Sequence, residues 1–509
     1  MARIGHPPGD RPPALWRRVV VRPKPIPTNL PKWLVGDWNR VIRDPLDVLR
    51  LAPLIGAIVT VIVGDWNRVI RDPLDLLRLA PLIGAITTLI VGDTTHTGEL
   101  VGAFLIVLAP RVLNVQRPFD LIFQLGMNLA VWGNVFGLFD KIYGYDKVVH
   151  FILPCGSAMM LYITLCHLRL VPDLSEDAGL HDRVAMVLVT LAFGLTVGGI
   201  FEMWEWFSNK VFGTEMFVTY GDSIGDLIDD TLGALAGGVI LLFWTGRGWG
   251  TWRTPGAALR GKEPMPTAPP DRDKDLLSRF GDRLARLRPP RGHESEGGRP
   301  YPTLPAWLVG DWGRVIRDPV DLIRLSLLAG ALLCVLQADW AHAARFAFGF
   351  GASVLARLAE APRPFDAAFA LGMAFQAWGA YSGAYESVTG YEVTARVAAS
   401  GSIAALLYLL LVRFRAVPDL AGKSDIHERT GILLTATSLG FGVGMLYEVG
   451  AWASNGLFDA RPFTFDELIA HMAIDFVASA AGAALLVFWN RARWQTRRVP
   501  ASVLVKPSR

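Results

Sequence analysis

The chain has 509 residues, of which 52% are hydrophobic and only 19% are charged, and its mean hydropathy is +0.34. Water-soluble globular proteins of this size carry a larger share of charged residues, so the composition indicates an integral membrane protein whose partner is the lipid bilayer. The net charge of +4 is small and is accounted for by basic tails and loops, so no nucleic-acid partner is predicted.

The front of the chain combines a basic tail with a local repeat. Residues 1–34 are proline-rich, lack the compact apolar stretch of a signal peptide and are predicted to stay in the cytoplasm. Residues 35–76 are a duplicated amphipathic and apolar segment, in which VGDWNRVIRDPLD occurs twice. The run Asp72, Pro73, Asp75 predicts a helix start with a capping side chain and proline in the first turn. Whether residues 51–64 also cross the membrane stays open.

Apolar stretches long enough to cross a bilayer recur along the rest of the chain, and they predict an all-α fold, a polytopic transmembrane helical bundle. The expected spans form two tandem six-helix units, residues 77–245 and 305–490. In the first unit they lie near 77–92, 98–113, 120–139, 147–167, 184–207 and 226–244. In the second they lie near 322–337, 341–358, 366–386, 395–413, 430–453 and 467–489.

The two units are related by an internal repeat with an offset of 246 residues, as RPFD at 117 and 363 and VPDL at 171 and 417 illustrate. Such self-similarity predicts a tandem duplication of a whole membrane unit. Residues 246–304 join the units as a cytoplasmic linker, in which 271–290 predict a basic amphipathic helix. Both this linker and the C-terminal tail, 491–509, are basic, and an even number of spans per unit then places both termini in the cytoplasm.

Acidic residues gather at the opposite ends of the spans, on three helices of the first unit. Helical spacing of three or four residues puts each set on one helix face. Charged side chains at membrane depth are tolerated when they face the bundle interior or a wet cavity, so the three faces are expected to converge on one pocket. The predicted catalytic residues are Asp146, Lys147, His150, Glu202, Glu205, Asp222, Asp226 and Asp230.

Carboxylates this close together require either shared protons or a bound cation. Carboxylates with one imidazole suit a divalent metal ion such as Mg, Mn or Zn, with His150, Glu202 and Asp226 as the ligands. Other interpretations stay open: a helix-entry histidine bonded to Asp146, Asp222 as a helix cap, and Asp229 as a solvated charge or a neighbour of Lys210.

The second unit provides an internal comparison, because the offset aligns each acidic position with a residue of that unit. The cluster is thinner there and contains an arginine that could close it with internal salt bridges, so the first unit is expected to be the working one. The aligned pairs are Asp146 with Glu392, Lys147 with Val393, His150 with Arg396, Glu202 with Glu448, Glu205 with Ala451, Asp222 with Glu467, Asp226 with His471, Asp229 with Ile474, and Asp230 with Asp475.

The motifs YDKVVHF, EMWEW and GDSIGDLIDDTLGA resemble those of the YjdF-type predicted inner-membrane proteins of bacteria and, more distantly, a VanZ-like pattern. The resemblance covers roughly 77–245 and, more weakly, 310–490. It implies a multi-pass protein of the bacterial inner membrane with the eight residues above at characteristic positions, but it implies no particular reaction.

Three functions remain open from the sequence. The pocket could activate water against a lipid-linked or envelope substrate, with His150 or Glu202 as the base. The same carboxylates could relay protons or cations in a transporter, or the cluster could only lock helices together as a scaffold.

Overall fold

The computed structural model describes residues 73–113, 115–167, 170–171, 180–212, 218–247, 251, 319–414, 417, 419–420, 424–458, 463–494 and 496. Within these residues every secondary-structure element is an α-helix. Outside them lie the predicted N-terminal tail, the first copy of the front repeat, the amphipathic helix at 271–290 and most of the C-terminal tail.

The first half of the described chain contains six longer helices and two short ones. The longer helices are α4 (Pro73–Val91), α5 (Thr94–Val107), α7 (Arg117–Phe136), α9 (Tyr145–His167), α10 (Leu180–Phe212) and α11 (Tyr220–Gly246). The short ones are α6 (Ala109–Val112) and α8 (Leu138–Lys141). Helix α7 ends earlier than the predicted span because Gly137, with φ of 58°, adopts the left-handed conformation that terminates a helix.

The second half has the same order of long helices. These are α15 (Val320–Leu336), α16 (Trp340–Leu358), α17 (Arg363–Ser382), α19 (Tyr391–Arg413), α20 (Ile426–Phe458) and α21 (Phe465–Ala492), with the short α18 (Ala384–Ser387) before α19. Three helices, α17, α19 and α20, begin and end 246 residues after α7, α9 and α10.

The chain is an all-α polytopic membrane protein. Among the described helices, seven are long and apolar enough to cross a membrane, namely α4, α9, α10, α11, α19, α20 and α21. Two of the other long helices are short for a bilayer, since α5 has 14 residues and α15 has 17. The expectation of six spans in each half therefore stays a prediction.

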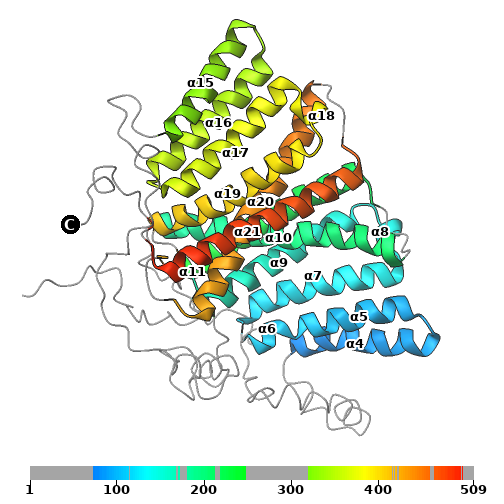
Figure 1. Ribbon diagram of the computed structural model, residues 1–509. Helices are drawn as coiled ribbons and strands as arrows, with labels where there is room; N and C mark the ends of the chain where they lie inside the picture. The colour runs from blue at the N-terminus through cyan, green and yellow to red at the C-terminus, as the bar shows by residue number, and fades with distance from the viewer. Residues whose placement is uncertain are drawn as a thin grey trace, which may run out of the picture.

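The six helices α9, α10, α11, α19, α20 and α21 occupy the middle of the molecule, with α4, α5 and α7 on one side and α15, α16 and α17 on the other (Figure 1). The halves meet where α10 packs against α20. There Gly199 faces the side chains of Phe441 and Met445, and these two residues share a buried cluster with Leu195 of α10. Small residues let helices approach closely where lipid supplies little hydrophobic driving force.

Each flanking group of helices contains a buried arginine between two aspartates. In the first half Arg78 donates to Asp75 at 2.6 Å and also to Asp120. In the second half Arg324 donates to Asp321 at 2.9 Å and also to Asp366. A buried charge is tolerated only when it is paired, so these contacts tie α4 to α7 and α15 to α17.

Close contact between α9 and α11 depends on glycine. A Cβ atom at Gly233 would clash with the backbone carbonyl of Phe151, and one at Gly237 would lie 2.8 Å from the carbonyl oxygen of Cys155. The two backbones therefore touch one helical turn away from the polar residues of α11.

Gly233→Ala is expected to lower the free energy of unfolding by about 1–3 kcal/mol, because the added methyl group forces α9 and α11 apart. The matched control is Gly225→Ala in the same helix, where a Cβ atom meets nothing within 4 Å. That control is expected to be neutral or slightly stabilising, since alanine is the better helix former. Equal loss of stability in both variants, measured by thermal unfolding in detergent, would contradict this packing.

Candidate functional site

The predicted polar residues of the first half converge at one end of the bundle. Asp146 and His150 come from the first turns of α9, Glu202 and Glu205 from the last part of α10, and Asp226 and Asp230 from the first half of α11. These three helices pack against one another pairwise. The wall of three helices expected from the sequence is therefore present.

His150 is the centre of the cluster, and its side chain is 4% exposed. Its Nδ1 atom lies 3.1 Å from Oδ1 of Asp230, which is fully buried. Its Nε2 atom lies 3.5 Å from Oδ1 of Asp146. A hydrogen bond at one ring nitrogen fixes the imidazole orientation and leaves the other nitrogen for a ligand.

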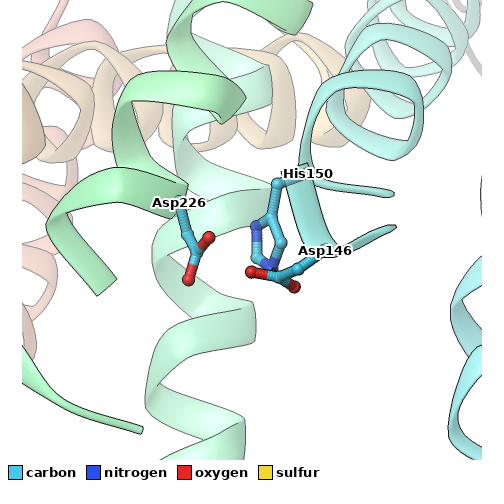
Figure 2. A group of neighbouring side chains, drawn as sticks. All are labelled: Asp146, His150 and Asp226. Atoms are coloured by element: carbon cyan, nitrogen blue, oxygen red, sulfur yellow. Dashed lines mark ion pairs between the residues drawn. The ribbon is translucent and has the colours of Figure 1, made fainter. Parts of the chain in front are cut away.

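Asp146, His150 and Asp226 can present one ligand atom each, all within 4.8 Å of one another. Figure 2 shows the three side chains turned toward a common point, two from α9 and one from α11. Two carboxylates and an imidazole suit Zn or Mn, and three protein ligands would leave a coordination position for water. The residues thus fit a divalent metal, with Asp146 in the place where the sequence favoured Glu202.

Glu202 lies apart from this group and is fully buried. Neither of its carboxylate oxygens has a hydrogen-bond partner. The hydroxyl of Ser223 is close to this carboxyl but not in hydrogen-bonding geometry. Glu205, one turn further along α10, is half-buried and interacts electrostatically with Glu202. The pair thus extends from the buried part of the cluster toward the helix end.

Two predicted residues lie at the edge of the cluster. Lys147 is 63% exposed and its Nζ atom lies 3.9 Å from Asp229, so it does not neutralise the buried carboxylates. Asp222 is half-buried in the first turn of α11, but it is not the cap. Thr219 caps the helix instead, because its hydroxyl accepts a hydrogen bond from the backbone N–H of Asp222.

In the second half an arginine occupies the centre of the equivalent cluster. Arg396 Nη1 donates to Glu448 at 2.8 Å and to Asp475 at 3.3 Å, and Nη2 contacts Nδ1 of His471 at 2.8 Å. His471 Nε2 in turn lies 2.9 Å from Glu392. The internal salt bridges expected from the sequence are therefore present, and they place a permanently charged guanidinium among the carboxylates of this cluster.

One contact between the halves was not expected from the sequence. Asp466, on α21, accepts a hydrogen bond from Trp206 Nε1 at 2.6 Å and lies 3.4 Å from Lys210. Of the two alternatives for Asp229, a solvated charge or a neighbour of Lys210, the second is wrong, because Asp229 lies near Lys147 and Lys210 lies near Asp466. The paired residues are about half the chain apart in sequence, so no local spacing predicts the contact. It is recognised only from the packing of α10 against α21.

The polar residues around His150 on α9, α10 and α11, called the first cluster below, lie within the part of the chain that matches a known protein family. A family model described as "Predicted membrane protein (DUF2238)" matches residues 94–247, from α5 to the end of α11. No curated protein and no solved structure shows significant similarity to the chain. The match supports a membrane protein and assigns no activity to it.

Proposed function

We propose that the first cluster binds a divalent metal ion and that the protein is a membrane-embedded, metal-dependent hydrolase. The observation that carries this proposal is that Asp146, His150 and Asp226 bring their ligand atoms close together. The Nδ1 atom of His150 is bonded to Asp230, which fixes the imidazole. A carboxylate bonded to the far nitrogen of a ligating histidine is the usual outer partner in metal sites. In the second half, Arg396 occupies the position equivalent to His150 and supplies a positive charge to the carboxylates. This supports the proposal that a cation is also needed in the first cluster.

The residues of the first cluster have different roles in the proposed hydrolysis. When bound, the metal would supply Lewis acidity and lower the pKa of a coordinated water. Asp146, His150 and Asp226 would hold it, and Asp230 orients the imidazole. Glu205 lies on the facing helix, one turn beyond Glu202, where its carboxylate could accept a proton from the attacking water and pass it outward.

Hydrolysis is favoured over transport because the acidic residues of the cluster end at Asp230. One helical turn beyond Asp230, the backbones of α9 and α11 touch at Gly233 and Phe151, and again at Gly237 and Cys155. A transporter needs a polar path that continues past this point. A pure scaffold is less favoured because both oxygens of Glu202 are left without partners, whereas a locking cluster should satisfy them.

The substrate and setting follow from the proposed topology. With basic tails and linker in the cytoplasm, the cluster faces the outer side of a bacterial inner membrane, which suits a lipid-linked or envelope substrate. We also propose that the protein is a tandem relative of the YjdF-type and VanZ-like proteins, with two six-helix units. The recurrence of helix bounds after 246 residues supports the duplication, and Arg396 supports a structural role for the second unit.

Asp226→Asn should abolish metal-dependent hydrolysis, with a loss of about 100-fold or more, because it removes one charge and one ligand of three. The purified protein in lipid nanodiscs would be assayed against lipid-linked phosphate and acyl esters, with Zn or Mn added or chelated. Asp229→Asn removes an acid one turn away, outside the ligand group, and should keep full activity. Turnover that survives chelation would refute the proposal, and Asp226-dependent cation flux would favour the transporter.

A further inference from the structure

Two fully buried carboxylates have oxygen atoms without a hydrogen-bond partner, in the part of the cluster away from the proposed metal ligands. Glu202 is fully buried and both of its oxygens lack a hydrogen bond, and Asp230 is fully buried with Oδ2 in the same condition. Asp230 Oδ2 points across to α10, where it lies against Gly198, one turn before Glu202. Unpaired carboxylate oxygens at this depth are expensive, and either a proton or a bound cation relieves that cost.

In the second half, a positively charged group lies between the two equivalent carboxylates. Glu448 and Asp475 align with Glu202 and Asp230, and Asp475 Oδ2 likewise packs against Gly444, the equivalent of Gly198. Here a single atom, Arg396 Nη1, lies 2.8 Å from Glu448 and 3.3 Å from Asp475. A positive group bridges the two carboxylates, and only Glu448 Oε2 is left without a partner.

The first half lacks the groups that complete this bridge. His150 replaces the arginine, and it bonds Asp230 through Oδ1 alone. Pro154 stands where the second half has Ser400, whose hydroxyl donates to Asp475 Oδ1 at 2.6 Å. Proline has no side-chain donor, so α9 offers nothing further to Asp230 Oδ2 or to Glu202.

We propose that a second cation binds between Glu202 and Asp230, in the place that Arg396 Nη1 takes in the other half. It would lie deeper than the ion held by Asp146, His150 and Asp226, so the first cluster is a two-metal site. Carboxylate oxygens, with the Ser223 hydroxyl close by, are hard ligands that select Mg or Mn over softer ions. This inference rests on the proposed function, since it adds a second ion to the same cluster.

Manganese binding to the full-length protein in nanodiscs tests the inference. Equilibrium dialysis of the wild type should give two Mn ions per chain, and electron paramagnetic resonance should show the weakened, spin-coupled signal of a pair. Glu202→Gln should reduce the count to one and restore an isolated-ion signal, whereas Asp229→Asn should keep two. His150→Arg, which introduces the side chain of the second half, should bind none.

The outcomes separate the two proposals. A wild type that binds one Mn and loses it on Asp146→Asn, but not on Glu202→Gln, overturns the second site and leaves the first. A wild type that binds none overturns both. Two ions that both persist in Glu202→Gln would overturn the assignment of Glu202. The wild-type count and spectrum decide the matter even if a variant fails to fold.

Discussion

Replacing His150 with arginine is expected to abolish divalent-metal binding while leaving the protein folded. The second half already contains this arrangement, because Arg396 sits among Glu448, Asp475 and His471 within hydrogen-bonding distance. In the first half a guanidinium at 150 would neutralise the same carboxylates and remove the only imidazole ligand. Metal affinity should fall by about 100-fold or more, since even outer partners of metal ligands contribute 10–100-fold.

Isothermal titration with Zn and with Mn measures this effect. The matched control is His96→Arg, which makes the same replacement at a part-exposed histidine in the first turn of α5. The control should bind metal like the wild type. Thermal unfolding of His150→Arg should occur at or above the wild-type temperature, because an arginine paired with buried acids removes their mutual repulsion. Wild-type metal affinity in His150→Arg would contradict the role of this residue.

Arg396→Ala should be among the most destabilising single substitutions in the second half. Arg396 is 5% exposed, and its removal leaves Glu448 and Asp475, which are 0% and 2% exposed, without their cation. Breaking a buried ion pair from one side lowers the free energy of unfolding by about 3–5 kcal/mol. The loss arises from uncompensated buried charge, so it should be larger than the loss of packing alone.

A companion variant separates charge from packing. Arg396→Met combined with Glu448→Gln removes one charge of each sign and should recover much of the stability lost in Arg396→Ala. Unfolding by heat or by denaturing detergent measures both, with Lys147→Ala as a surface control, since Lys147 is 63% exposed. If Arg396→Ala unfolds at the wild-type temperature, the second cluster is not held together by its arginine.

Much of the fold could be predicted because the signals are local. Apolar runs of bilayer length set the helices, and Asp146 with His150, or Asp226 with Asp230, share a face through four-residue spacing. The cost of charge in an apolar medium then predicts that these faces meet. The structure places α9, α10 and α11 together as expected. The alignment of His150 with Arg396 also predicted the internal salt bridges of the second half from the sequence alone.

Details that depend on tertiary placement could not be predicted. The choice of Asp146 over Glu202 beside the imidazole depends on how α10 is rotated against α9, and hydropathy does not encode that rotation. Asp466 pairs with Trp206 and Lys210 across the halves, a contact that a repeat pattern cannot reveal. By contrast, Thr219 as the cap of α11 had a local signal, a threonine three residues before Asp222.

The cluster of the first half is expected to take up a metal ion where the cluster of the second half has Arg396. Elemental analysis of the purified wild type beside its Asp226→Asn variant tests it most directly. The wild type should contain bound divalent metal in whole-number proportion to the chain, and the variant should lose at least one ion per chain at unchanged yield and fold. A wild type that contains no metal after exposure to Zn, Mn and Mg, or a variant that retains the full amount, would contradict the claim.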